Sequence, residues 1–242
     1  MKSERIQKVL ANVGIASRRK IEEMIQAGRI TVNNKLAVLG QSVSDDDKIK
    51  VDGRIIKVEE SSPDDIYVIM YHKPEGMICT RDDPEDRPTV FEDLPKLRRG
   101  RWISVGRLDV NTSGLILFTN NGELANKLMH PSADIEREYA VRVHGRVTDR
   151  ILENLREGVE LDDGPARFEN IQVAGGEGTN QWFYVVVKEG RNRVVRRLWE
   201  SQGLDVSSLK RVRFGSIILP KSLRRGQWVE LTEDAVEDLL GY

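Results

Sequence analysis

The sequence predicts an α+β protein in two parts: a small module of helices and short strands, then a domain with a mixed, mainly antiparallel sheet and flanking helices. Apolar residues near the N-terminus recur with a helical period. A polar stretch without periodicity, residues 59–65, separates them from the rest. Beyond it, apolar runs of strand length are joined by short loops, which favours antiparallel neighbours. We therefore expect a module at residues 1–60, a linker at 61–65 and a larger domain at 66–242.

Two helices are expected in the module. The spacing i, i+3, i+4, i+7 followed by a glycine indicates the first one, with Ile6, Val9, Leu10, Val13 and Gly14. Ser17 suits the N-cap of the second helix, whose buried side and closing glycine are Ile21, Met24, Ile25 and Gly28. A strand at 30–32, an Asn33-Asn34 turn and further short strands towards Val51 complete the module.

The larger domain is expected to contain more strands than helices. Apolar runs predict strands at residues 66–72, 115–119, 138–144, 168–173, 183–188, 209–214 and 228–231. Helical patterns predict helices at residues 123–129, 149–157, 193–201 and 234–240. The glycine-rich stretch 175–178 is expected to be a loop between strands.

Composition and charge limit the classes of function. With one cysteine, Cys79, the chain has no internal disulfide or cysteine-only metal cage, and its three scattered histidines suggest no metal site. No apolar run is long enough to span a bilayer, and no signal-peptide core opens the chain, so we expect a cytoplasmic protein. The net charge of −1 hides segregation: residues 191–225 hold ten basic residues against two acidic ones. Such a zone suits contact with a polyanion.

The start of the second predicted helix carries three cations. Arg18, Arg19 and Lys20 oppose the helix dipole, a cost that a docked phosphate would offset. The segments 5–19 (RIQKVLANVGIASRR), 28–33 (GRITVN) and 47–53 (DKIKVDG) resemble the alpha-L RNA-binding module, first recognised in a small-subunit ribosomal protein. The resemblance implies an RNA-binding surface that includes Arg5, Lys8, Ser17, Arg18, Arg19, Lys20 and Arg29.

The segment 106–115, GRLDVNTSGL, is a glycine-flanked loop that leads into an apolar strand. Such a loop can hold the carboxylate of Asp109 at the edge of a cleft, although an aspartate in a turn is by default a turn former. The segment resembles the aspartate motif of pseudouridine synthases that modify ribosomal RNA and carry an alpha-L module. Three more segments agree in order with that family: 71–76 (YHKPEG), 137–139 (REY) and 189–198 (EGRNRVVRRL).

This resemblance implies the roles of the site residues. Asp109 is the reacting carboxylate, and Arg196 is the guanidinium that pairs with it and keeps it charged. Tyr139 stacks on the extruded uracil. We expect RNA contacts from Arg107, Arg191, Arg193 and Arg197 as well. Apart from the resemblance, Tyr139 would be a core residue and Arg196 a solvated cation.

The function that we expect is the isomerisation of one uridine in large-subunit ribosomal RNA, without cofactor or metal, by a monomer. The stretches 122–132 (GELANKLMHPS) and 198–203 (LWESQG) point to the large-subunit branch of the family. Two alternatives remain at this stage. One is a paralogue that modifies another ribosomal uridine, including one of the small subunit. The other is a ribosome-associated RNA-binding protein without catalysis.

Overall fold

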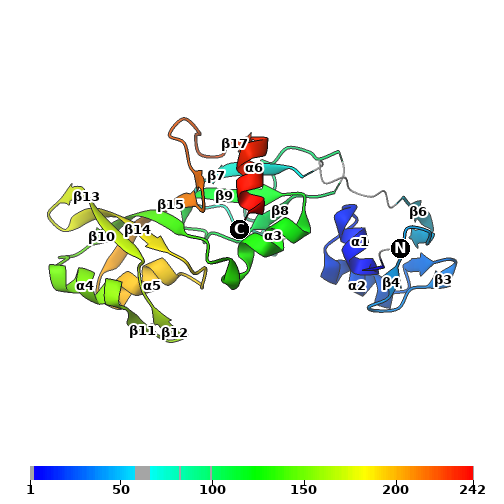
Figure 1. The fold of residues 1–242 in the computed structure, drawn as a ribbon, viewed down its shortest axis with the longest axis horizontal. Coiled ribbons are helices and arrows are strands. Elements are labelled where there is room, and N and C mark those ends of the chain that lie inside the picture. The colour runs from blue at the N-terminus through cyan, green and yellow to red at the C-terminus, as the bar shows by residue number, and fades with distance from the viewer. Residues whose placement is uncertain (1–2, 58–65, 82, 99, 242) are drawn as a thin grey trace. The chain divides into compact units, whose positions relative to one another are not determined.

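The computed structural model describes residues 3–57, 66–81, 83–98 and 100–241, and the chain divides into two compact units (Figure 1). The first unit comprises Met1–Ile66 with Pro95–Ile103 and Asn120–Gly122. The second comprises Tyr67–Leu94, Ser104–Thr119 and Glu123–Tyr242. The predicted linker, residues 61–65, lies outside the described residues.

The first unit contains the two predicted helices and short strands. Helix α1 spans Ile6–Asn12, and α2 spans Arg18–Gln26 with the Ser17 hydroxyl accepting from the backbone N–H of Lys20, as an N-cap should. Strands in the order β3-β2-β5-β6 form one sheet, and β1 pairs with β4. Their bounds are β1 Glu4–Arg5, β2 Ile30–Val32, β3 Lys35–Leu36, β4 Ser42–Val43, β5 Ile49–Val51 and β6 Arg54–Ile56. The helices bury Ile6, Leu10 and Ile21 against Ile30 and Ile49.

A segment from much later in the chain belongs to the first unit. Pro95–Ile103 is part of it, and Gly14 comes so close to Gly100 that a Cβ at Gly14 would stand 2.6 Å from the Gly100 carbonyl oxygen. Gly14 also has a φ of +87°, which favours glycine. The glycine expected to end α1 therefore also permits a close backbone approach. We expected the module to be continuous in sequence, whereas the compact unit is not.

The second unit is built on a nine-stranded mixed sheet in the order β13-β14-β10-β15-β9-β7-β17, with β16 on β15 and β8 on β9. The neighbouring pairs along this order are antiparallel except β9 with β15, which is parallel. This confirms the predicted fold class. The bounds are β7 Val68–Lys73, β8 Ile103–Val105, β9 Ser113–Thr119, β10 Arg137–His144, β13 Asn170–Glu177, β14 Asn180–Val187, β15 Asp205–Phe214, β16 Ile217–Ile218 and β17 Trp228–Glu230.

The parallel seam between β9 and β15 depends on a glycine. Gly114 pairs with Arg211, and a Cβ on it would stand 2.2 Å from the Arg211 carbonyl oxygen. Its φ of +109° is also one that side chains rarely adopt. Because the segment 106–112 leads directly into β9, the seam fixes where that loop emerges from the sheet.

Helices cover one face of the β13-β14-β10-β15 half of the sheet. Leu152 and Leu155 of α4 (Asp149–Glu157) and Leu198 and Trp199 of α5 (Val194–Glu200) share a core with Phe183, Val185 and Val187 of β14. The Trp199 ring lies 5.0 Å from the ring of Phe183. The other elements are α3 Gly122–Met129, the 3-10 helix η2 Pro131–Ala133, the hairpin β11 Val159–Leu161 with β12 Gly164–Ala166, and α6 Glu233–Leu240.

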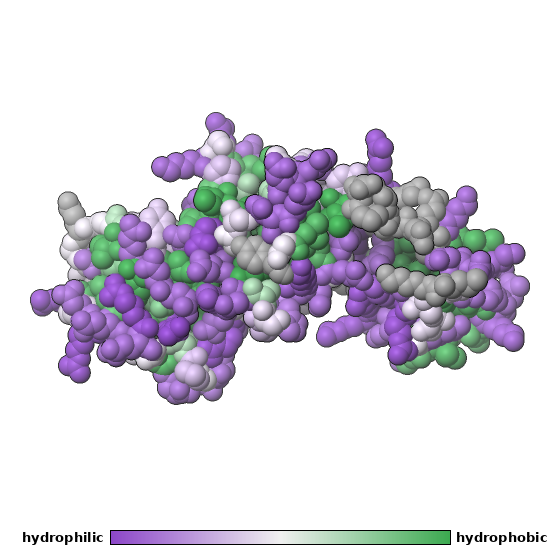
Figure 2. All heavy atoms as spheres, viewed as in Figure 1, coloured by the Kyte–Doolittle hydropathy of each residue, from purple (hydrophilic) through white to green (hydrophobic). Residues whose placement is uncertain are grey.

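Hydrophilic residues cover much of the visible surface, with hydrophobic patches among them (Figure 2). Exposed hydrophobic residues occur in both units. Within the described residues, no helix combines the length and apolar character that crossing a bilayer requires.

Candidate active site

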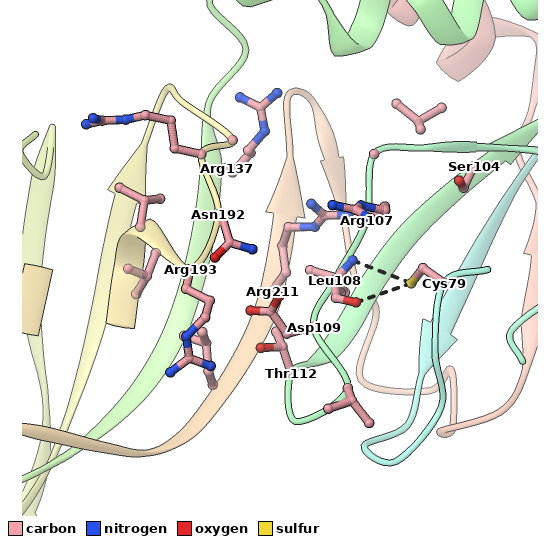
Figure 3. Close-up of a pocket in the computed structure, with 18 of the residues that line it drawn as sticks. Cys79, Ser104, Arg107, Leu108, Asp109, Thr112, Arg137, Asn192, Arg193 and Arg211 are labelled. Carbon is pink, nitrogen blue, oxygen red and sulfur yellow. Dashed lines mark hydrogen bonds between the residues drawn. The ribbon is translucent and has the colours of Figure 1, made fainter. Parts of the chain in front are cut away.

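A cavity of about 830 Å³ opens in the second unit where the segment before β9 faces β10, β15 and the segment before α5. Asp109 and Tyr139, two of the three predicted catalytic residues, line it. In the close-up, Asp109 lies between Arg193 and Asn192 on one side and the Cys79–Leu108 pair on the other (Figure 3). The structure thus brings together residues more than 80 positions apart in the sequence.

Lys73 at the end of β7 holds the backbone of the Asp109 loop. Its side chain is fully buried, and Nζ donates to the carbonyl oxygens of Pro74 at 3.0 Å, Asp109 at 3.1 Å and Thr112 at 2.8 Å, with Val110 at 3.4 Å. Burial lowers the pKa of Lys73, and the negative charge of Asp109 acts in the opposite direction. An interior ammonium among four carbonyls is stabilised by those dipoles. Lys73 therefore fixes the path of the loop.

Arg196 acts on the same loop from α5, but not through the expected contact. Its guanidinium donates to the carbonyl oxygens of Asn111 and Val206, both at 2.9 Å. Among the hydrogen bonds and ion pairs of the described residues, none joins it to the Asp109 carboxylate. Arg196 is 5% exposed and is not among the residues that line the cavity. Burial is the main cause that lowers its pKa, Arg193 lowers it further, and the charge of Asp109 raises it.

The Asp109 carboxylate differs from the other carboxylates of the cavity. Asp83 is bound by Arg87, with an N–O distance of 2.9 Å, and Glu189 by Arg191. Across the described residues, Asp109 is the acidic side chain of the lining that has no ion-pair partner. It is partly exposed, while Lys73 and Arg196 hold the backbone from Asp109 to Thr112. The loop is fixed, and its carboxylate is available to a ligand.

Tyr139 reaches the cavity from β10, partly buried against the core cluster. Arg137, two residues earlier on the same strand, also lines the cavity and donates to the carbonyl oxygens of Ile135 at 2.6 Å and Lys188 at 2.7 Å. Burial lowers the pKa of Arg137. These bonds hold the Arg137 guanidinium at the wall of the cavity that Tyr139 also lines.

The four other arginines expected to contact RNA in this domain fall into two groups. Arg107 is exposed and lines the cavity, as does Arg193, which begins α5 with a φ of +51°. Arg191 and Arg197 instead bind Asp163 in the β11–β12 turn, at 2.9 and 2.7 Å. Arg197 lies outside the lining. The ion pairs of Arg191 and Arg197 tie the hairpin to α5, while Arg193 pairs with Glu200 of its own helix at 3.4 Å.

The candidate RNA contacts of the first unit also differ in their partners. Lys8 binds Glu4, Lys20 binds Glu23, both at 2.8 Å, and Arg29 makes a two-pronged pair with Asp52. Arg5 donates to the Gly40 carbonyl, and Ser17 caps α2. Arg18 and Arg19 are exposed and, within the described part of the chain, have no ion-pair partner. The two cations on the first turn of α2 are therefore the most available to a phosphate.

Some residues of the site were missed from the sequence. They are Lys73, Arg137 and Arg211, all buried, of which Arg211 donates to the Leu115 carbonyl oxygen at 2.7 Å across the parallel seam. A signal existed for each. Lys73 is a cation at the end of an apolar strand, and Arg137 shares the strand face of Tyr139. Arg211 lies in the basic segment that follows α5.

Comparison with protein families gives two matches. The model described as RNA pseudouridylate synthase matches residues 67–201, and the model described as S4 domain matches residues 4–49. A solved structure titled "Crystal structure of pseudouridylate synthase" superposes with a TM-score of 0.67 at 25% identity, over 97% of this chain and 99% of that one.

Curated relatives are similar over most of the chain. Proteins named "Ribosomal large subunit pseudouridine synthase B" from Vibrio cholerae and Escherichia coli K12 are each 60% identical over 95% of the chain, which spans 72% and 79% of their lengths. The protein of that name from Pseudomonas aeruginosa is 57% identical over 98% of the chain, which spans 61% of its length. The predicted resemblance is confirmed.

Proposed function

We propose, since this chain belongs to the RNA pseudouridylate synthase family, that it isomerises a uridine of large-subunit ribosomal RNA to pseudouridine with Asp109 as the reacting carboxylate. Family membership makes the chain an isomerase. The choice of large-subunit RNA is supported by the names of relatives that are 57–60% identical. The role of Asp109 is supported by the site.

One observation carries the assignment of Asp109. Its carboxylate lines the cavity without an ion-pair partner among the described residues, on a loop that two buried cations hold by its backbone. A carboxylate that must approach a ribose cannot also be occupied by a salt bridge, yet it must be accurately placed. The positive charges of Lys73 and Arg196 lie close enough to interact with it. These cations therefore supply attraction without blocking the oxygens.

The reaction needs such a group beside the anomeric carbon. The bond between uracil N1 and ribose C1′ breaks, the base turns, and uracil C5 bonds to C1′. The proton of C5 leaves and N1 gains one, so atoms balance. A carboxylate at C1′ can act as nucleophile, as in retaining glycosidases, or as a base on the sugar. Both roles need the Asp109 carboxylate beside the ribose.

The other lining residues suit the handling of an extruded nucleotide. A uridine in folded RNA must leave its stack before a protein group can reach its sugar. The Tyr139 ring, held half-buried on β10, offers a face on which a pyrimidine stacks. Arg107 and Arg193 are exposed at the cavity and can meet phosphates. We also propose that the chain acts as a monomer. Ribosomal RNA as the substrate also places the work in the cytoplasm.

The test is carbodiimide mapping of pseudouridine in ribosomal RNA from cells with and without this protein. We expect one large-subunit stop to disappear on deletion, to return with the wild-type gene, and to stay absent with Asp109→Asn. A lost stop in small-subunit RNA would contradict the choice of substrate. A stop restored by Asp109→Asn would contradict the role of Asp109.

A further inference from the structure

The sheet of the second unit has a second face, on the side away from the cavity. Along a strand, neighbouring side chains point to opposite faces. Tyr139 and Arg211 line the cavity, so Ala140 and Lys210 point away from it. On β14, Phe183 packs in the core below α4 and α5, while Trp182 and Tyr184 remain 36% and 39% exposed. Two aromatic rings are thus left in solvent on the uncovered face.

The strand register places cations next to these rings. Trp182 pairs with Arg142, whose guanidinium carbon lies 5.8 Å from the centre of the Trp182 ring. Tyr184 pairs with Ala140, which pairs with Lys210 on β15. With about 4.8 Å between strands, Tyr184 and Lys210 lie roughly 10 Å apart across a small residue. We call Trp182, Tyr184, Arg142, Lys210 and the nearby Arg225 the back face.

The cations of the back face have no carboxylate partners among the described residues. Arg225 lowers the pKa of Lys210, after burial, the larger cause, and no acidic group acts against it. The pKa of the buried His72 is lowered by burial first and then by both Lys210 and Arg225, against a hydrogen bond to the Leu223 carbonyl that raises it. Lys210 and Arg225 therefore both lie near His72.

Two acidic groups on the strands of the back face, Glu138 and Asp205, do not cancel this charge. Glu138, on the same face of β10, is bound by Arg213 at 2.8 Å. Asp205 lies at the far end of β15, where it pairs with His144 rather than with Lys210. The middle of the face thus combines positive charge with exposed rings.

We propose that the back face binds single-stranded RNA, with bases stacked on Trp182 and Tyr184 and phosphates at Arg142, Lys210 and Arg225. Rings two residues apart on a strand are about 7 Å apart, which suits successive unstacked nucleotides on a sheet. The charge complements a polyanion. An apolar protein partner would instead need a continuous apolar surface, and here the rings are flanked by cations, Ser207 and Gln172. This site goes beyond the proposed function, because it holds RNA away from the cavity.

Photo-crosslinking tests the location directly. The full chain carrying Asp109→Asn is irradiated with a single-stranded oligouridylate that contains thiouridine, and crosslinked peptides are mapped by mass spectrometry. We expect crosslinks on the peptide that contains Trp182 and Tyr184. Crosslinks confined to the first unit and to the cavity segments would overturn the proposal.

Matched variants test the energetics. We expect Trp182→Ala with Tyr184→Ala to weaken binding of the oligouridylate to the back face at least tenfold, roughly the loss of two stacked bases, seen as loss of the back-face crosslink at equal RNA concentration. Arg142→Ala with Lys210→Ala should weaken the same crosslink and make it less salt-dependent. The controls are Trp228→Ala, a ring 40% exposed on β17, and Arg150→Ala on α4. Circular dichroism verifies that each variant folds.

The outcomes separate this proposal from the proposed function. Loss of crosslinking in the back-face variants with an unchanged kcat on saturating ribosomal RNA and a raised KM supports the back face. If the back-face variants changed neither the crosslink nor the KM, the proposal would be wrong, and the exposed rings would instead suit a protein partner. If the wild-type chain failed to form pseudouridine, the crosslink would still be readable, because it needs no turnover.

Discussion

The placement of Asp109 results from contacts made by its loop and not by its carboxylate. The carbonyl oxygens from Asp109 to Thr112 accept from Lys73 or Arg196, and Gly76 donates its N–H to the Val110 carbonyl at 2.8 Å. Buried cations among carbonyls are stable only when their geometry is well satisfied. Each loop carbonyl thus keeps the backbone in place, while the carboxylate keeps its freedom.

Replacing Lys73 by methionine should release this loop. The four carbonyl oxygens would lose their buried donor, so we expect a loss of unfolding free energy of about 2–4 kcal/mol and a fall in kcat larger than any change in RNA affinity. Urea denaturation and single-turnover kinetics measure the two effects. Lys221→Met, at an exposed lysine, is the control and should change neither. If the Lys73→Met protein were as active and as stable as the wild type, the conformation of the Asp109 loop would not depend on Lys73.

For single residues, the sequence predicted which residues belong to the site more accurately than it predicted the contacts that they make. The position of Asp109 in a glycine-flanked loop before an apolar strand was predicted, and the structure has it there. The direct Arg196–Asp109 contact that we expected is absent from the described interactions, because the start of α5 directs the guanidinium to the Asn111 and Val206 carbonyls. A sequence motif indicates which residues lie close together in the site. The hydrogen bonds that the Arg196 guanidinium makes depend on how α5 packs on β15.

The elements that frame the cavity depend on the β9–β15 seam. Gly114→Ala should destabilise the fold by more than about 3 kcal/mol, since the new Cβ would collide with the Arg211 backbone at 2.2 Å and at a φ of +109°. Thermal unfolding measures this change. Gly175→Ala is a matched control with the same φ of +109° and no atom within 4 Å, and should cost about 1 kcal/mol. If both variants lost the same stability, backbone strain and not the collision with Arg211 would explain why glycine is needed at position 114.

The loop that brings Asp83 and Arg87 to the cavity lining should be sensitive to acid. Arg87 donates to the Asp83 carboxylate through its side chain and its backbone, which lowers the pKa of Asp83 to about 2. Because the folded pKa lies below the ordinary value of 3.8, the pair stabilises the loop above that value and is lost as pH falls through about 2. Carbon-13 NMR of the Asp83 carboxyl measures the midpoint. Arg87→Gln should return it towards 3.8; a midpoint near 3.8 in the wild type would exclude the pair.

Periodicity and capping residues within a segment predicted the long helices and strands. They did not predict elements that depend on contacts with residues far away in the sequence. Helix α4 has the predicted bounds, since its apolar spacing and the Thr148 cap are local. The β11–β12 hairpin was not predicted, because Arg191 and Arg197 hold it through Asp163. The predicted loop at 175–178 was wrong: β13 continues to Glu177. There Gly176 comes so close to β14 that a Cβ would be 2.4 Å from the Asn180 carbonyl oxygen.

At the scale of the whole molecule, the fold class was predictable and the composition of the first unit was not. Two helices, short strands and a mixed sheet follow from patterns within each segment. Pro95–Ile103 packs with residues from the first part of the chain, where Gly14 lies close to Gly100. Hydrophobic periodicity does not predict such a long-range contact. Removing residues 1–60 would therefore also strip packing from Pro95–Ile103, and point variants are the better probe.

Arg18→Ala with Arg19→Ala should weaken RNA binding and reduce its salt dependence. Both cations are exposed on the first turn of α2 and, in the described residues, without ion-pair partners. We expect the slope of log K against log salt to fall by about 1.4–1.8, the loss of two phosphate contacts. Fluorescence anisotropy over a salt series measures it. Arg29→Ala should have a smaller effect, because Asp52 already binds the Arg29 guanidinium. A larger effect of Arg29→Ala than of the double variant would contradict RNA contact at the start of α2.

The most direct test of the central claim is tritium release from ribosomal RNA labelled at uracil carbon five, with wild-type and Asp109→Asn protein. Asparagine keeps the shape of the side chain and removes its charge, so the loop held by Lys73 and Arg196 should remain folded. We expect release to fall at least about a thousandfold while RNA is still bound. Release at the wild-type rate from the Asp109→Asn protein would contradict the assignment of Asp109 as the reacting group.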